Sequence, residues 1–123
     1  MTSETKNELS YGLIPFYYDK NKSDVLAHIE YLKKTVEGLR KAGVKKVVVV
    51  DDGSQIPLPK EELGYDEIVE LKENQGKTGA VLAGLNSIFK DKPENLKYIV
   101  QCDYDSDQNS EDAEFLLKRF KNS

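Results

Sequence analysis

The chain has 123 residues, of which 38% are hydrophobic and 33% charged, a composition typical of one folded domain rather than of a disordered segment. Its 18 Lys and Arg residues against 22 Asp and Glu give a net charge of −4, which argues against a general nucleic-acid binder. One cysteine and one histidine exclude a disulfide framework and a Cys/His zinc cluster within the chain.

The N-terminal residues 1–7 are polar and lack the apolar core of a signal peptide. No later run approaches the ~20 apolar residues that span a bilayer. We therefore predict a cytoplasmic protein without a transmembrane segment, a single domain over residues 1–123, and a flexible or peripheral N-terminus over residues 1–9. The apolar run Gly12–Phe16 then predicts a strand, and Tyr17-Tyr18-Asp19 predicts the loop after it.

A helix is predicted from about Ser23, because apolar residues recur there every three or four positions. They are Val25, Ile29, Leu32, Val36 and Leu39. Asn21, Ser23 or Asp24 can cap its start, and Gly43 suits the left-handed residue after its end. Four consecutive valines, 47–50, follow without alternation, which is typical of a parallel strand buried on both faces.

The second half of the chain continues the alternation of strands and helices. After the turn Asp51–Ser54 and a loop with two prolines, Glu67–Leu71 is a weaker strand candidate. The Gly-rich loop Asn74–Gly79 opens a helix that ends near Asp91 and is expected to point Val81, Leu82, Leu85, Ile88 and Phe89 inward. A strand over Lys97–Cys102, the acidic segment Asp103–Asp107 and a last helix over about Ser110–Phe120 follow.

This order, β-α-β-β-α-β-α, predicts an α/β domain with three α/β/α layers, Rossmann-like, around a mostly parallel sheet. Ligands of such folds bind at the carboxyl ends of the strands. The chemically distinctive segments of this chain lie at those ends or open a helix, so we expect the site there.

The acidic segment is the first candidate for chemistry. Asp103, Asp105 and Asp107 alternate in a stretch that we predict to be extended, so their carboxylates are expected to point to one side. Two carboxylates ~6 Å apart repel by roughly 3 kcal/mol at an effective dielectric constant of ~20, and Mg²⁺ or Mn²⁺ would relieve that repulsion. The alternative is a solvated acidic loop that caps the last helix. Two features argue against an EF-hand: Gln108 stands where that loop requires glycine, and the segment before Asp103 is predicted to be a strand rather than a helix.

Two other segments have both a functional and an ordinary interpretation. Asp51-Asp52-Gly53-Ser54 is either a turn or a place where a carboxylate accepts from a base or a ribose. Asn74–Ala80 is either a strand-to-helix turn or a phosphate cradle with Lys77 as its cation. The cradle resembles the end of a Walker A loop, but Leu71 stands where that motif needs glycine, so a P-loop NTPase using Gly76-Lys77-Thr78 is the weaker alternative.

Three further side chains have simpler interpretations. His28 lies at the edge of the first helix's apolar face and is interpreted as a partly buried structural residue. Cys102, at the end of a strand, is expected to be a small buried hydrophobe. Tyr17 and Tyr18 could stack on a base.

Taken in order, the motifs resemble the N-terminal half of an inverting family 2 glycosyltransferase of the GT-A fold, a family that includes the dolichyl-phosphate sugar synthases. The resemblance covers roughly residues 11 to 120. It depends on Ile14-Pro15-Phe16-Tyr17, on Val50-Asp51-Asp52-Gly53-Ser54, on Asn74, Gly76, Lys77 and Ala80, and on the strand from Tyr98 into Asp103-Tyr104-Asp105.

The resemblance implies a domain that binds a UDP- or GDP-sugar with a divalent metal, Mg²⁺ or Mn²⁺, for sugar transfer. The implied nucleotide-binding residues are Pro15, Phe16, Tyr17, Asp51, Asp52, Asn74, Gly76, Lys77 and Asp103. The implied metal ligands are Asp103, Asp105 and Asp107, the last of which stands where the synthases carry glutamine.

The sequence also departs from the family pattern. Tyr18 and Asp19 replace the usual Asn-Glu after the first turn, and the acceptor surface and catalytic base of the family come later in sequence than this chain extends. The expectation is therefore donor binding with the acceptor side incomplete, or supplied by a partner chain or a second copy. The alternative from another class is a non-catalytic nucleotide or nucleotide-sugar binding module.

Overall fold

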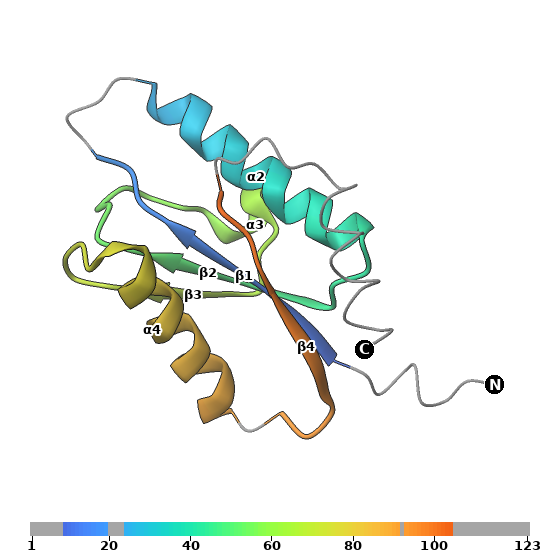
Figure 1. Ribbon diagram of the computed structural model, residues 1–123. Coiled ribbons are helices and arrows are strands. Elements are labelled where there is room, and N and C mark those ends of the chain that lie inside the picture. Colours follow the sequence, from blue (N-terminus) through green and yellow to red (C-terminus); the bar gives the residue numbers. More distant parts are fainter. Residues whose placement is uncertain (1–8, 20–23, 92, 105–123) are drawn as a thin grey trace.

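The computed structural model describes residues 9–19, 24–91 and 93–104, which form a four-stranded sheet between two layers of helices (Figure 1). Strands β1 (Leu9–Phe16), β2 (Lys46–Asp51), β3 (Glu67–Glu70) and β4 (Leu96–Gln101) lie in the order β3-β2-β1-β4, and all neighbouring pairs are parallel. Helices α2 (Val25–Lys41) and α3 (Lys60–Leu63) cover one face, and α4 (Gly76–Lys90) covers the other. The predicted α/β class with Rossmann-like layers is confirmed.

Strand β2 carries the core on both of its faces, as its run of valines predicted. Val47 and Val49 pack in the cluster under α2, whereas Val48 and Val50 pack in the cluster under α4, and all four are fully buried. Branched β-carbons favour the extended backbone, and burying each such side chain contributes about 1.5–3 kcal/mol. The valines therefore explain both the strand and its interior position.

Strand β1 is longer than the sequence indicated. The strand begins at Leu9 rather than Gly12, so Leu9 belongs to the sheet and only residues 1–8 of the predicted peripheral N-terminus lie outside the described residues. The extension could not be predicted from hydrophobicity, because Ser10 is polar although it is buried in the sheet. Its hydroxyl and carbonyl oxygens both accept from the backbone N–H of Lys45, at 3.0 and 3.2 Å, so a serine is satisfied inside the sheet.

Helix α2 matches its predicted apolar face, with Leu32, Val36 and Leu39 buried under the sheet. Asp24 is at the N-cap position as expected, but its backbone is left-handed and its side chain makes no capping hydrogen bond. Gly43 has the predicted positive φ, 101°, just after the helix.

Helix α4 differs from its prediction in its start and in its buried face. It begins at Gly76, so most of the predicted Gly-rich loop is the helix's first turn. The prediction that Leu82 and Phe89 point inward is wrong, since both are more than half exposed. Ala80, Gly84 and Ile88 form the buried face instead, at four-residue spacing.

Gly84 explains this rotation of the helix. A β-carbon there would lie 2.9 Å from Val50 Cγ2 and closer still to Leu13, which is too close for any side chain. The helix therefore presents its small residues to the sheet, and the larger Leu82 and Phe89 face solvent.

One further difference concerns the segment between β2 and β3. Helix α3 (Lys60–Leu63) was not predicted, and its single turn lies within the predicted proline-containing loop. The predicted last helix over about Ser110–Phe120 lies outside the described residues, and so do Asp105 and Asp107 of the acidic segment before it. Within the described residues, no helix has the length and apolar character needed to cross a membrane.

Candidate functional site

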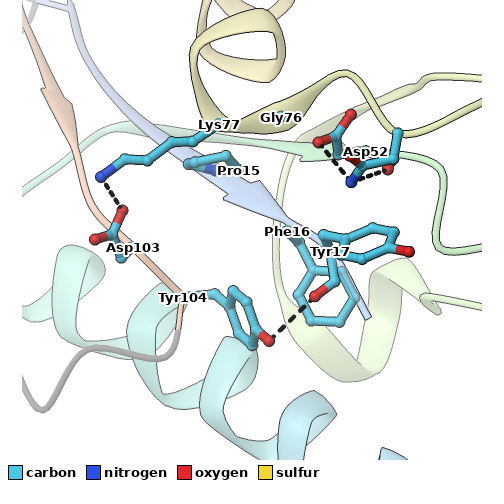
Figure 2. A pocket seen from close by; sticks show the side chains of 9 residues that line it. Pro15, Phe16, Tyr17, Asp52, Gly76, Lys77, Asp103 and Tyr104 are labelled. Carbon is cyan, nitrogen blue, oxygen red and sulfur yellow. Dashed lines mark hydrogen bonds and ion pairs between the residues drawn. The ribbon is translucent and has the colours of Figure 1, made fainter. Parts of the chain in front are cut away.

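A cavity of about 310 Å³ lies at the carboxyl ends of the strands (Figure 2). It is formed by the end of β1, the turn after β2, the start of α4 and the segment after β4. Its lining residues are Pro15, Phe16, Tyr17, Asp52, Asn74, Gly76, Lys77, Asp103 and Tyr104. The structure therefore brings together all the predicted nucleotide-binding residues except Asp51.

Asp51 does not line the cavity because of its position in β2. Side chains alternate along a strand, so Asp51 shares the α2 face with Val47 and Val49. It is buried, and its Oδ1 accepts from the backbone N–H of Ser54 at 3.0 Å. The structure thus gives Asp51 a role in the turn after β2, not a place in the cavity wall.

Asp52 points the other way and connects β2 to the start of α4. Although it lines the cavity, only 3% of the residue is exposed. Its Oδ1 accepts from the backbone N–H of Gln75 at 2.7 Å, and its Oδ2 accepts from Asn74 Nδ2 at 3.1 Å. A carboxylate is favourable beside the positive end of a helix dipole, so Asp52 and the N-terminus of α4 stabilise one another.

Lys77 and Asp103 form an ion pair on the other side of the cavity (Figure 2), with Lys77 Nζ 2.8 Å from Asp103 Oδ1. The same oxygen accepts from Gln101 Nε2 at 3.2 Å. The Lys77 ammonium holds the pKa of the Asp103 carboxyl below its ordinary value, although burial acts in the opposite direction. Asp103 is therefore a carboxylate at any pH near neutral.

Aromatic rings form the wall between these charged groups. The ring centroids of Phe16 and Tyr104 are 4.5 Å apart, and Tyr17 lines the same cavity (Figure 2). Tyr17 is 41% exposed, so its ring can contact a ligand. Tyr18 is buried and its ring packs against His28 at a centroid distance of 5.2 Å, which leaves Tyr17 as the better stacking surface of the two tyrosines.

Tyr104 is the lining residue that the sequence interpretation missed, and helix α2 holds it in place. Its hydroxyl lies 2.8 Å from His28 Nδ1 and donates to the Tyr17 carbonyl at 3.2 Å. Its own carbonyl accepts from Thr35 Oγ1 at 2.9 Å. His28 is thus a partner of the cavity wall rather than only a structural residue. The position of Tyr104 inside the Asp-Tyr-Asp motif was the available signal, whereas nothing in the sequence marks Thr35.

The predicted metal site is only partly within the described residues. Asp103 lies there, whereas Asp105 and Asp107 lie outside. Among residues 9–19, 24–91 and 93–104, no three His, Cys, Asp or Glu side chains lie together in a way that could hold a metal ion. Mg²⁺ bound to a nucleotide uses one or two carboxylates together with phosphate oxygens, so Asp103 fits as one ligand of such a site.

A second, smaller cavity of about 240 Å³ adjoins the first and shares Tyr17 and Asn74 with it. Its other lining residues come from the loops after β1, β2 and β3, and include Asp19, Gln55 and Lys72. The exposed Tyr17 ring therefore borders two cavities.

Cys102 lies directly before the site and is buried, as its position at a strand end predicted. Burial, with a smaller contribution from Asp103, raises the pKa of its thiol to about 11. Only the thiolate attacks a disulfide reagent, so at pH 8 we expect Cys102 to react with dithiobis-nitrobenzoate at least ~100-fold more slowly in the folded protein than in urea. Equal rates in the two conditions would contradict the burial of this thiol.

Comparison with models of known protein families gives no match, and comparisons with curated proteins and with solved structures give none either.

Proposed function

We propose that the chain is a glycosyltransferase-type domain that binds a nucleotide-diphospho-sugar, a UDP- or GDP-sugar, together with a divalent metal ion. The observation that carries this proposal is the cavity itself. It combines an exposed aromatic ring, a carboxylate, a lysine at a helix N-terminus and a second carboxylate, drawn from four separate segments. These are the groups that a base, a ribose, a diphosphate and a cation require.

The Asp52 side of the cavity suits the nucleoside. Tyr17 offers a ring face for stacking on the base, and Pro15 adds an apolar surface beside it. Each Asp52 oxygen has two lone pairs, so after accepting from Gln75 and Asn74 it can accept from a base N–H or a ribose hydroxyl. Because the protein's own hydrogen bonds fix that carboxylate, little freedom is lost when the ligand binds.

The Lys77 side of the cavity suits the diphosphate. Lys77 lies in the first turn of α4, where its ammonium and the helix dipole both favour phosphate oxygens. Asp103, with Asp105 and Asp107, would hold Mg²⁺ or Mn²⁺ beside that group. The metal would supply charge neutralisation to the departing nucleoside diphosphate.

Donor binding is better supported than transfer. Of the two carboxylates that line the cavity, Asp52 is held by two hydrogen bonds and Asp103 by Lys77, so neither is placed as a base for an acceptor hydroxyl. The same observation favours a second candidate, a nucleotide-sugar binding module without catalysis. If the chain takes part in sugar transfer, a partner chain or a second copy would complete the acceptor side.

The P-loop alternative has weaker support. Phosphate cradles of that type use the backbone N–H groups of the loop before the helix. Here the N–H of Gln75, directly before α4, already donates to Asp52.

A titration of isotope-labelled protein with UDP-glucose or GDP-mannose and MgCl₂, followed by amide NMR spectra, tests the proposal. We expect the largest shifts at residues 16, 17, 52, 74, 76, 77, 103 and 104, because these line the cavity. Residues around the separate cavity between α2 and α3, such as Glu37 and Gly64, serve as the internal control and should not shift.

No shifts with either nucleotide-sugar, or shifts confined to the control residues, would contradict the proposal. If binding is seen, an assay of free sugar and of transfer to added acceptors separates the two candidates, since a binding module would show no turnover.

A further inference from the structure

The ion pair between Lys77 and Asp103 joins two elements across the cavity, since Lys77 belongs to the first turn of α4 and Asp103 follows β4. Their side chains are 58% and 44% exposed, so both groups can be reached by a ligand (Figure 2). Opposite charges within hydrogen-bond distance neutralise one another, and this pair therefore lowers the positive potential that an anion would meet at Lys77.

A diphosphate that approaches this site meets two obstacles. Its oxygens compete with Asp103 for the Lys77 ammonium, and they also come close to a second negative charge. A diphosphate that brings a cation meets neither obstacle. Asp103 can exchange Lys77 for the cation, and Lys77 can exchange Asp103 for a phosphate oxygen, so that no charge is left without a partner.

We propose that Asp103 is an internal competitor for Lys77, and that the pair makes the site select a diphosphate carrying its own divalent cation over the free diphosphate anion. This inference rests on the proposed function, and it adds a specificity-determining role to a residue that would otherwise only hold a metal. By linkage, the cation and the diphosphate then strengthen each other's binding by the same factor.

The proposal makes an unusual prediction for Asp103→Asn in EDTA. A residue that acts only as a metal ligand has no effect on binding when no divalent ion is available. An internal competitor opposes binding there, so its neutralisation should tighten the binding of UDP, GDP and inorganic pyrophosphate by about two- to fivefold, the range expected from breaking an exposed ion pair. In MgCl₂ the same variant should lose most of the enhancement that the wild type gains from the metal. Calorimetric titration measures both effects.

Two controls separate the competition from the general effect of removing a negative charge. Glu73→Gln removes an exposed carboxylate that lines the adjoining cavity, at the same end of the sheet, and should change the affinity less than Asp103→Asn. In a Lys77→Met background, Asp103→Asn should tighten binding no more than Glu73→Gln does. The Lys77 and Asp103 side chains are 58% and 44% exposed and Glu73 is exposed, so the thermal midpoints of the variants should stay within a few degrees of the wild type.

The outcomes distinguish this inference from the proposed function. Unchanged or weaker binding of all three probes by Asp103→Asn in EDTA, or equal tightening in the Lys77→Met background, would overturn the inference and leave the proposed function intact. If UDP and GDP bind no better than pyrophosphate but Asp103→Asn tightens pyrophosphate as expected, the inference stands and the proposed function fails. If none of the probes binds in EDTA or in MgCl₂, both are overturned.

Discussion

Replacing Asp52 with alanine is expected to lower the free energy of unfolding by about 2–4 kcal/mol, because two hydrogen bonds to a charged, buried acceptor are lost. The variant leaves the N–H of Gln75 without its acceptor, and it leaves the Asn74 amide only the longer 3.4 Å bond to the backbone carbonyl of residue 52, at the start of the helix that carries Lys77. Urea unfolding measures the loss of stability. The affinity for UDP or GDP should fall at least ~10-fold at a temperature where the variant is still folded, because the loop that borders the cavity is no longer held.

Asp52→Asn separates the two roles of this side chain. The asparagine can still accept from Gln75, and the Asn74 amide can rotate so that its oxygen faces the new amide. Most of the stability should therefore return, whereas the affinity should stay low if the ligand needs the negative charge. Asp91→Ala, an exposed acid at the far end of α4, is the matched control and should change neither quantity. A wild-type unfolding free energy for Asp52→Ala would contradict the anchoring role.

Replacing Gly53 with alanine is expected to be at least as damaging, at about 2–4 kcal/mol, because two separate costs add. The residue has a φ of 83°, which favours glycine. An added β-carbon would also lie 2.6 Å from the backbone of both Glu73 and Asn74, where no flexible side chain can move aside. The backbone of the cavity loop must shift, so nucleotide affinity and stability should both fall, as measured by urea unfolding and by calorimetric titration.

Gly64 provides the matched control for this prediction. Its φ of 81° is nearly the same, but the nearest atom to an added β-carbon is Val36 Cγ1 at an ordinary 3.7 Å. Gly64→Ala should therefore show only the backbone cost, about 1–2 kcal/mol, and should leave nucleotide affinity unchanged. If Gly53→Ala and Gly64→Ala lower the free energy of unfolding equally, the close approach of residues 53 and 74 does not contribute to the cost of the substitution.

The strands and the location of the cavity could be predicted from the sequence because their signals are local. Consecutive valines require burial on both faces, and that requirement identifies a parallel strand between two helical layers. Once the strands are parallel, the polar residues at their carboxyl ends must meet at one edge, which is why most of the predicted lining residues do so.

The errors arose where packing between distant segments decides the outcome. Hydrophobicity alone placed Leu82 and Phe89 inside, but the close contact of Gly84 with Leu13 and Val50 determines which face of α4 is buried. Asp51 was grouped with Asp52 because they are adjacent, although alternation along β2 sends them to different surroundings.

The hydrogen-bond and ion-pair partners of the site's polar groups could not be predicted from the sequence either. The contact of Tyr104 with His28 joins positions far apart in the chain, and so does the ion pair of Lys77 with Asp103. No local spacing encodes such contacts, since the first depends on how α2 lies against the segment after β4 and the second on how α4 lies against it.

The strand order has a consequence for biosynthesis. The central strand β1 is made first, yet one of its two neighbours, β4, is made last among the described elements. A chain still attached to the ribosome can pair β1 with β2 and β3, but Asp103 and Tyr104 reach the cavity only after β4 has emerged. The candidate site is therefore the last part of the described fold to assemble, and long-range parallel pairing of this kind makes that final step slow. Until that step, one edge of the central strand remains open to incorrect pairing with other chains.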